Sequence, residues 1–565
     1  MPHWRAAIFE LGQTRKRSLR NMPSPGLTSK KETRRRGRPA ARRKAQRGSK
    51  QPSIDINDRF RQALDMMECT SRSTFITGRA GTGKSTLLSY FHHATEKKVA
   101  VLAPTGVAAL NVKGQTIHSF FGFKPNITLE RVRKVRFSDE KKNIYKKLDA
   151  IVIDEISMVR ADLLDCVDKF LRLNGPRGDR PFGGIQMIFF GDLYQLPPVT
   201  AGTEKVVFRS FYKTPYFYSA KVFDSFEMEF IELEKVYRQH DEQFLSLLNS
   251  IRNNSIAEDG LELLNQRHMP QFEPPPNDFY IYLTTTNKLA EQINASQLAK
   301  LKGKLYAFTA SIGGEFGDKN LPTAIDLQIK VGAQIMLVNN DADGRWVNGS
   351  VGKITRITQD KNEEDVIIAE LAHGKTVEIT PYTWEIFRFF VEGGQLQSEV
   401  IGRFEQYPLM LAWAVTIHKS QGKTFDKVII DIGKGTFSYG QIYVALSRCT
   451  TLDGIILRKP ILKKHIWTDY KVVDFLTKYQ YKKAEQSYPV NDKVEAIRKA
   501  IENESALQIV YLKPNDEKTR RTIRPETVGE MEYRGKKYLG MRAFCMKRNE
   551  ERTFRIDRIL EIEEA

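Results

Sequence analysis

The sequence is poor in cysteine and has no long apolar run. Its 565 residues hold four cysteines (Cys69, Cys166, Cys449 and Cys545), and none forms a C-x-x-C pair. A zinc site or a disulfide framework is therefore not expected, and a reducing compartment fits. No apolar run reaches the ~20 residues that a membrane-spanning helix needs. The basic N-terminal residues are not followed by the apolar segment of a secretory signal, so we expect a cytoplasmic protein without a membrane partner.

Most of the chain also lacks excess charge, although the net charge is +21. Residues 1–50 alone carry +14, whereas residues 51–492 carry +4 and residues 493–565 carry +3. The high isoelectric point therefore belongs mainly to an N-terminal tail. A nucleic-acid site in the body of the protein is expected to be a local groove.

The tail, residues 1–50, has almost no acidic residues and is predicted to be disordered. Arg36-Gly37-Arg38-Pro39 resembles the core of an AT-hook, which binds the DNA minor groove. An organelle-targeting segment has the same scarcity of acids. A start codon assigned too far upstream gives the same appearance, so the role of the tail stays open.

Compact β-branched and aromatic runs alternate with helical patterns from residue 51 onward, which is typical of a buried parallel sheet. The first group of predicted strands comprises Ser73–Thr77, Val99–Pro104, Leu148–Ile153 and Ile185–Phe190. The second group comprises Tyr280–Thr284, Ala333–Val338, Leu409–Thr416, Lys427–Asp431 and Gly454–Leu457. We therefore predict an α/β fold with two parallel-sheet domains.

Short strands with turns between Gly349 and Tyr407 predict a small all-β insertion. The C-terminal domain, residues 493–565, is predicted as a helix followed by several strands. The expected division is a tail (1–50), a first domain (51–230) with a small basic insert (about 121–147), a second domain (231–460) with the β insertion (about 349–407), a linker (461–492) and a C-terminal domain (493–565).

Residues Gly78–Ser85 match G-x-x-x-x-G-K-[ST] at every position, after a predicted strand and before a helix. Backbone N–H groups of such a loop converge on phosphate oxygens, and the helix N-terminus favours negative charge. Lys84 is expected to neutralise the β- and γ-phosphates, and the Ser85 hydroxyl to hold Mg²⁺. The predicted nucleotide-binding residues are Gly78, Gly81, Thr82, Gly83, Lys84, Ser85, Thr86 and Gly422.

Three further side chains follow apolar strands and complete a nucleotide hydrolase site. Asp154 is suited to coordinate Mg²⁺, and Glu155 to activate the attacking water. Gln195 is placed to sense a γ-phosphate or to orient water. ATP and Mg²⁺ are therefore the expected cofactors.

Arginines in the second region suggest that hydrolysis drives movement. Arg238 and Arg448 are candidates to reach across a cleft to the γ-phosphate, although each alone is more often part of a surface salt bridge. Small and hydroxyl residues in Pro104–Ala109, Thr116–Phe121 and Thr416–Gly422 suit phosphate contacts of a nucleic acid. Phe120 is a candidate to stack on a base, and core packing is the alternative for it and its neighbour.

The basic segment Glu130–Lys147, with eight Lys/Arg against three acids, is either a solvated helix face or an insert lying on DNA.

The ordered motifs over residues 54–460 resemble superfamily 1 helicases of the RecD-like branch, and among them the Pif-type DNA helicases. Telling stretches are Asp154–Val159, Arg180–Gln186, Ile417–Gly422 and Tyr439–Arg448.

The resemblance implies two RecA-like domains, a wedge in the first, an SH3-like fold in the second, and ATP-driven 5′→3′ translocation on single-stranded DNA. Unwinding of forked DNA in repair, recombination or replication by a monomer is the implied function. As ATPase residues it implies Lys84, Ser85, Asp154, Glu155, Gln195, Arg238 and Arg448. Along the DNA path we predict Pro104, Thr105, Gly106, His118, Phe120, Thr416, His418 and Lys419.

One departure concerns adenine recognition. The family has a glutamine early in its first helix, whereas this chain has Phe60 at that place and Gln62 two residues later. The motifs predict the phosphate chemistry but leave the choice of base open.

Residues 493–565 resemble a WYL domain, a small β-rich module that binds nucleic acid or a nucleotide-like ligand, although the eponymous triplet here is Lys537-Tyr538-Leu539. An aromatic and basic pocket is predicted from Tyr511, Tyr538, Arg542, Arg555 and Arg558. A purely structural module is the alternative. We expect removal of the WYL domain to alter DNA affinity or coupling and to leave basal phosphate chemistry unchanged.

A competing hypothesis for the whole chain is a P-loop switch or DNA-binding regulator without motor activity.

Overall fold

The computed structural model describes residues 56–565, except for 125–126, 137–142, 200–207, 209, 240, 276–277, 317–320, 362 and 393–394. For residues 387–392 and 395–398 only the backbone is described. The predicted disordered tail 1–50 and part of the predicted basic insert 121–147 therefore lie outside the described residues.

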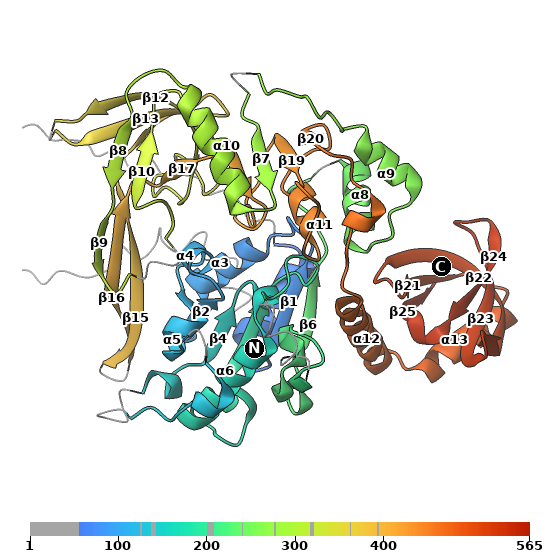
Figure 1. Cartoon of the computed structure of the whole chain (residues 1–565). Helices are drawn as coiled ribbons and strands as arrows, with labels where there is room; N and C mark the ends of the chain where they lie inside the picture. Colours follow the sequence, from blue (N-terminus) through green and yellow to red (C-terminus); the bar gives the residue numbers. More distant parts are fainter. Residues whose placement is uncertain are drawn as a thin grey trace, which may run out of the picture. The chain divides into compact units, whose positions relative to one another are not determined.

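Six parallel strands form the first sheet, in the order β3-β2-β4-β5-β1-β6. Figure 1 labels β2, β4, β1 and β6 of this sheet. They are β1 (Thr74–Gly78), β2 (Val99–Ala103), β3 (Gln115–Thr116), β4 (Ala150–Ile153), β5 (Gln186–Phe190) and β6 (Glu229–Leu233). The apolar runs predicted four of these strands to within two residues. β6 was not predicted, and it extends the first sheet beyond the expected boundary at residue 230.

Successive residues of the central strands enter two different cores, because side chains alternate across a sheet. Phe75 of β1 packs into one core and Ile76 into the other. The helices of this region are α2 (Asp58–Cys69), α3 (Lys84–Ala94), α4 (Gly106–Asn111), α5 (Ile117–Phe121) and α6 (Ala161–Asn174). Helices α2 and α3 contribute to the core of Ile76, and helices α5 and α6 to the core of Phe75.

A second parallel sheet has the order β18-β7-β19-β20. Its strands are β7 (Ile281–Thr284), β18 (Ala414–Thr416), β19 (Val428–Asp431) and β20 (Ile455–Leu457). The helices of this region are α8 (Glu242–Arg252), α9 (Glu258–Asn265), α10 (Asn287–Lys300) and α11 (Gln441–Leu446). The α/β fold with two parallel-sheet domains is confirmed.

The β insertion is larger than predicted. Its main sheet has the antiparallel order β14-β13-β12-β11-β17, and it is flanked by the smaller sheets β15-β16-β9 and β10-β8. The strands are β8 (Tyr306–Thr309), β9 (Ser311–Gly314), β10 (Asp326–Ile329), β11 (Gln334–Leu337), β12 (Val351–Gln359), β13 (Asp365–Leu371), β14 (Thr376–Ile379), β15 (Tyr382–Glu392), β16 (Gln395–Gln406) and β17 (Leu409–Leu411).

Two predicted strands were therefore assigned to the wrong sheet. Ala333–Val338 and the first half of Leu409–Thr416 were expected in the second parallel sheet, but β11 and β17 pair with each other in the insertion. Every residue of β11 is buried, so its apolar run resembles that of a parallel-sheet strand. Only the end of the second run, β18, joins the parallel sheet.

The predicted linker 461–492 is largely helical. Helix α12 (Tyr470–Ser487) buries Val472, Leu476, Thr477, Gln480 and Ala484 at helical spacing. Two of these core positions are polar, so the hydropathy pattern conceals the helix. Across the described ranges, no helix is both long and apolar enough to cross a lipid bilayer.

Helix α13 (Val490–Glu502) precedes the C-terminal antiparallel sheet, whose order is β24-β23-β22-β21-β25. Its strands are β21 (Leu507–Leu512), β22 (Lys518–Tyr533), β23 (Lys536–Cys545), β24 (Glu550–Arg555) and β25 (Ile559–Glu564). Helix α13 and these strands share one hydrophobic core, as expected for the predicted C-terminal domain.

Candidate active site

The loop Gly78–Ser85 joins β1 to α3 and has the backbone that its glycines predict. Gly81 and Gly83 have φ angles of +82° and +84°, in the left-handed region that glycine tolerates. A Cβ atom at Gly81 would lie 2.6 Å from Cβ of Arg238. Lys84 Nζ donates hydrogen bonds to the carbonyls of Gly78 (2.7 Å) and Arg79 (3.0 Å). Its ammonium is therefore held inside the loop.

Two carboxylates follow β4 in the sequence and lie beside this loop. Glu155 has φ +48° and ψ +43°, a left-handed conformation that costs free energy in a non-glycine residue. Its N–H donates to Asp154 Oδ1 at 2.9 Å, which fixes the two side chains relative to each other. Burial and the adjacent Glu155 raise the pKa of Asp154 to about 7. Burial raises the pKa of Glu155, against the lowering effect of Lys84 and Arg448.

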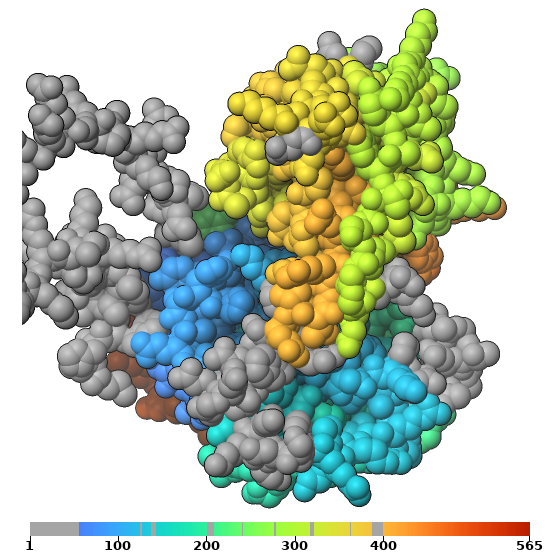
Figure 2. All heavy atoms as spheres, turned by 90° about the vertical axis from the view of Figure 1, so that its left-hand side faces the viewer, coloured from blue at the N-terminus to red at the C-terminus, as the bar shows by residue number. Residues whose placement is uncertain are grey.

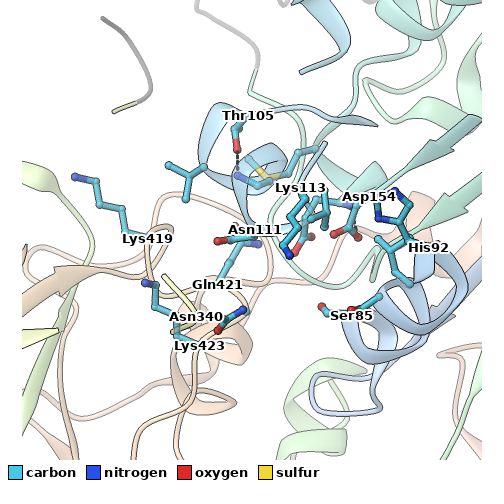
Figure 3. A pocket seen from close by; sticks show the side chains of 18 of the residues that line it. Ser85, His92, Thr105, Asn111, Lys113, Asp154, Asn340, Lys419, Gln421 and Lys423 are labelled. Atoms are coloured by element: carbon cyan, nitrogen blue, oxygen red, sulfur yellow. Dashed lines mark hydrogen bonds between the residues drawn. The ribbon is translucent and has the colours of Figure 1, made fainter. Parts of the chain in front are cut away.

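A cleft of about 670 Å³ contains many of the predicted residues. Ser85 and Asp154 lie on one side of it and Lys419, Gln421 and Lys423 on the other (Figure 3). Thr86 is exposed at the start of α3, and Gly422 also lines the cleft. The orange residues of the second region lie directly against the blue residues of the first (Figure 2). The hydroxyl and carboxylate oxygens of Ser85 and Asp154 have the chemistry that Mg²⁺ prefers.

Hydrogen bonds cross from the second region to the nucleotide loop. The Ala80 N–H donates to the Tyr443 hydroxyl at 3.0 Å. Arg238 Nη1 donates to the Ser447 carbonyl at 3.0 Å, and Gln239 Nε2 to the carbonyls of Ser447 (3.2 Å) and Cys449 (3.0 Å). The loop, the Arg238 segment and the end of α11 are thus linked directly.

Arg448 is 1% exposed and is bonded within the second region. Its guanidinium donates to the carbonyls of Val444, Ser420 and Lys423 and to the hydroxyl of Ser447. Burial, followed by the positive charge of Arg238, lowers the pKa of Arg448 to about 9. Glu155 exerts a smaller, raising effect on the same pKa. Arg238 thus lies beside Gly81 of the loop, whereas the guanidinium of Arg448 is held by hydrogen bonds within the second region.

Gln195 follows β5 and is tied to a neighbouring acid. Its Nε2 donates to Asp192 Oδ2 at 3.3 Å, and its N–H donates to the Asp192 carbonyl at 3.0 Å. Asp192 is 1% exposed and Gln195 is 7% exposed. Asp192 therefore holds Gln195, the predicted γ-phosphate sensor, in position. The sequence analysis assigned no role to Asp192.

Phe60 and Gln62 differ in their relation to the site. Phe60 is 3% exposed, and a Cβ atom at Gly83 would lie 3.0 Å from its ring. Gln62 is exposed and accepts a hydrogen bond from Arg59. Phe60 thus packs behind the phosphate loop, and Gln62 lies on the outer face of α2.

The predicted nucleic-acid residues fall into two groups. Thr105, His418 and Lys419 line the 670 Å³ cleft, and His418 stacks on Phe437 with ring centroids 6.2 Å apart. Thr416 is 4% exposed and its hydroxyl accepts the Lys419 N–H at 3.3 Å, so it caps a turn. Pro104, Gly106 and His118 are half-buried near the N-termini of α4 and α5. Burial lowers the pKa of both His118 and His418.

Phe120 does not have the exposed face that base stacking requires. It is 5% exposed and makes edge contacts with Phe121 (4.9 Å) and Tyr145 (5.6 Å). Its assignment as a base-stacking residue is therefore wrong. The core-packing alternative holds because Tyr145, from the basic segment, covers it.

Sequence reasoning missed a polar chain between three segments. Lys423 Nζ donates to Asn348 Oδ1 at 2.9 Å, and Asn348 Nδ2 donates to Asn111 Oδ1 at 2.8 Å. The chain joins the end of α4, the β insertion and the segment after β18. Burial, followed by the charge of Lys419, lowers the pKa of Lys423 to about 8. The lysine is adjacent to the motif at Thr416–Gly422, which was the available signal.

Three of the five residues predicted for the WYL pocket are joined by contacts of Arg555. A hollow of about 500 Å³ is lined by Tyr511 together with Lys513, Arg521, Glu550, Glu551, Arg552, Thr553 and Phe554. Arg555 lies over the Tyr538 ring at 5.1 Å and forms an ion pair with Asp557. Arg542 is exposed on β23, and Arg558 lies in the turn before β25. Arg555 thus contacts two of the other predicted residues, because its N–H also donates to the Tyr511 hydroxyl at 3.4 Å.

Comparisons with known proteins agree with this geometry. A family model described as PIF1-like helicase matches residues 56–260, a WYL domain matches 492–564, and a UvrD-like helicase C-terminal domain matches 411–452. The ATP-dependent DNA helicase Pif1 of Bdellovibrio bacteriovorus is 30% identical over 415 residues, which are 72% of this chain and 88% of that protein. The chain belongs to the PIF1-like helicase family.

The ATP-dependent DNA helicase PIF1 of Emericella nidulans is 29% identical over 513 residues, covering 79% of this chain and 66% of that longer protein. A crystal structure of Bacteroides sp. Pif1 in complex with ADP-AlF4 has a TM-score of 0.69 and 35% identity, covering 76% of this chain and 98% of that one. Bacteroides Pif1 bound to single-stranded DNA has a TM-score of 0.55 and 36% identity, covering 77% and 97%. The two parallel-sheet domains are thus RecA-like domains of this family, followed by a WYL module.

Proposed function

We propose that the chain is an ATP-dependent DNA helicase that hydrolyses ATP with Mg²⁺ between its two RecA-like domains. It uses the free energy to translocate on single-stranded DNA in the 5′→3′ direction and to open forked duplexes in repair, recombination or replication. The Bacteroides relatives with ADP-AlF4 and with single-stranded DNA support the two ligands. The direction is supported by the family resemblance.

One observation carries the proposal. Ala80 of the nucleotide loop is bonded to Tyr443 of α11, and Arg238, which lies beside Gly81 of the same loop, is bonded to the Ser447 carbonyl at the end of α11. A change at the phosphates therefore acts on contacts between the domains. Closure that depends on the nucleotide is what a two-domain motor requires.

Each proposed role follows from a group already described. Lys84 exchanges its bonds to the loop carbonyls for phosphate oxygens. Ser85 and Asp154 would hold Mg²⁺, which would supply positive charge beside the phosphates. Glu155, with its raised pKa, accepts a proton from the attacking water. Gln195 orients that water, while Arg238 and Arg448 stabilise the transition-state charge.

The proposed DNA path runs along Thr105, His418 and Lys419. Lys419 is exposed and contributes charge, while Thr105 stands at the N-terminus of α4, where backbone N–H groups favour a phosphate. We further propose that the WYL module takes a nucleic-acid or nucleotide-like ligand and that the protein translocates as a monomer. Tyr511 and Arg521 in the C-terminal hollow offer the aromatic and basic groups for such a ligand.

Strand displacement on 5′-tailed and 3′-tailed duplexes tests the proposal. Opening of the 5′-tailed substrate with ATP, and not of the 3′-tailed one, is expected. The Lys84→Ala variant is expected to lose DNA-stimulated ATP hydrolysis while it keeps single-strand binding. Retained turnover in this variant, or hydrolysis that single-stranded DNA does not stimulate, would favour the alternative of a nucleotide-dependent switch.

A further inference from the structure

The hairpin turn between β21 and β22 of the WYL module buries a carboxylate against the ATPase region. Asp516 is 8% exposed, although charged residues in a hairpin turn ordinarily face water. Its Oδ2 accepts a hydrogen bond of 2.9 Å from the Tyr194 hydroxyl, and its Oδ1 accepts one of 2.7 Å from Gln480 Nε2 of α12. Both carboxylate oxygens are therefore bonded to residues outside the module's sheet.

A buried arginine connects this carboxylate to a second one. The Arg252 guanidinium lies 3.9 Å from the centre of the Tyr194 ring. Its Nη1 is 3.9 Å from Asp516 Oδ2, and its Nη2 is 3.5 Å from Asp192 Oδ1. Arg252 is 5% exposed. A buried guanidinium needs its anionic partners, because an uncompensated buried charge is costly.

Asp192 carries the connection to the proposed catalytic groups. It accepts the Gln195 side-chain amide on Oδ2 and the Tyr194 N–H on Oδ1. Asp192 and Arg252 also act on Lys84 with opposite signs: the carboxylate raises the pKa of Lys84 and the arginine lowers it, in addition to the dominant lowering by burial. The chain of contacts thus runs from a WYL turn to the nucleotide loop.

Attachment of the turn to the first domain has a second anchor. Lys518 Nζ lies 2.5 Å from Glu232 Oε2 of β6 and 3.6 Å from Glu234 Oε1. This ion pair holds the base of the hairpin against the first sheet. Lys518 therefore attaches the hairpin to the first domain in addition to Asp516. The hydrogen bond of Asp516 to Tyr194 is made with the segment after β5.

We propose that Asp516 is a positioning residue for ATP hydrolysis, which acts through Arg252 and Tyr194 on Asp192 and Gln195. Asp516 shares the Arg252 charge with Asp192. Without it, Arg252 pairs with Asp192 alone, through Oδ1, and draws on the carboxylate whose Oδ2 holds Gln195. The WYL module then influences phosphate chemistry itself, unlike the expectation from sequence that it affects only DNA affinity or coupling. The inference rests on the proposed ATPase function.

The test measures steady-state ATP hydrolysis with saturating single-stranded DNA in the full chain. The variants are Asp516→Ala, Asp516→Asn, Tyr194→Phe and the double variant Asp516→Asn/Tyr194→Phe. Lys478→Ala is the matched control, because Lys478 lies on α12, the helix of Gln480, and pairs locally with Asp474. Thermal unfolding and binding of a fluorescent ADP analogue report the folded, nucleotide-competent fraction of each variant.

A fall in kcat of about 3- to 30-fold with unchanged KM for ATP is expected for the Asp516 and Tyr194 variants. The double variant is expected to lose no more than the larger single loss, because both changes interrupt one chain. The control is expected to hydrolyse ATP like the wild type. A role in folding alone lowers the competent fraction and leaves kcat per competent site unchanged.

Wild-type kcat in Asp516→Asn and Tyr194→Phe overturns the inference even if Asp516→Ala does not fold. Independent, multiplying losses in the double variant, or an equal loss in Lys478→Ala, overturn it as well. A wild-type chain without ATP hydrolysis refutes the proposed function itself. The wild-type measurement therefore distinguishes failure of the function from failure of the inference.

Discussion

The backbone N–H of Ala80 donates a 3.0 Å hydrogen bond to the hydroxyl of Tyr443, a residue 363 positions further along the chain. Ala80 belongs to the nucleotide loop and Tyr443 to α11 of the second domain. The Tyr443 hydroxyl is therefore a direct contact between the loop and the domain that carries Arg448. Burial raises the pKa of this hydroxyl to about 12, so it is neutral at physiological pH.

Tyr443→Phe is expected to slow DNA-stimulated ATP hydrolysis by about tenfold, the effect of losing one buried hydrogen bond of about 1.4 kcal/mol. The loop N–H then has no partner from the second domain. Tyr407→Phe is the matched control, since Tyr407 donates to the Asp365 carbonyl within the β insertion. Equal kcat values in the Tyr443 variant and the wild type would show that this contact does not serve hydrolysis.

Lys423 is expected to make single-strand binding sensitive to pH. Its pKa is lowered to about 8, mainly by burial, so the charged form is lost as pH rises from 7 to 9. Because Lys423 lines the cleft, affinity for a short oligonucleotide is expected to fall by about tenfold over this range, as for one lost charge-assisted contact.

Binding titrations at pH 7 and pH 9 and constant ionic strength measure this effect. Lys423→Arg keeps its charge throughout the range and is expected to bind almost equally at both pH values. Identical pH profiles for the variant and the wild type would assign the pH dependence to another group.

Contiguous motifs account for what the sequence predicted of the site. Lys84, Ser85, Asp154 and Glu155 each lie within a short segment, and the strand before each segment sets its place at the end of a sheet. Local chemistry therefore sufficed to predict their proximity. Arg238 and Arg448 could be predicted only as candidates. Arg238 reaches the loop because β6, which was not predicted, pairs with β1, and the place of Arg448 depends on how the two domains pack.

The contacts that sequence reasoning missed connect distant segments. Tyr194 and Asp516 are 322 positions apart, and a hairpin turn with an aspartate has the ordinary composition of an exposed turn. Helix α12 was missed because Thr477 and Gln480 occupy core positions, and Gln480 binds Asp516 there. Polar residues that are buried to serve a network have no signature in hydropathy.

Two phenylalanines distinguish core packing from base stacking. Phe120→Leu is expected to reduce the free energy of unfolding by about 1 kcal/mol, because the ring is buried. Its affinity for single-stranded DNA is expected to stay unchanged. Phe437 is 58% exposed and stacks on His418, so Phe437→Leu is expected to weaken single-strand binding by about 1–3 kcal/mol without loss of stability. Melting curves and oligonucleotide titrations on both variants separate the two effects. Weaker DNA binding by folded Phe120→Leu protein would restore the base-stacking role.

Gly440 is expected to tolerate no side chain, because it fits against the segment that holds Gln195. A Cβ atom there would lie 2.3 Å from the Tyr194 carbonyl oxygen and 2.7 Å from that of Gln195, and both are backbone atoms. Gly440→Ala is therefore expected to displace Gln195 and to reduce kcat for ATP at least about tenfold, the loss expected when a catalytic contact is misplaced.

Gly535→Ala is the control, since its φ of +73° resembles the +69° of Gly440 and its Cβ atom would meet no neighbour. The control bears only the left-handed backbone cost of about 1 kcal/mol, seen as a lower melting temperature with normal turnover. Normal turnover in Gly440→Ala would mean that the α11 segment approaches Gln195 without influencing hydrolysis.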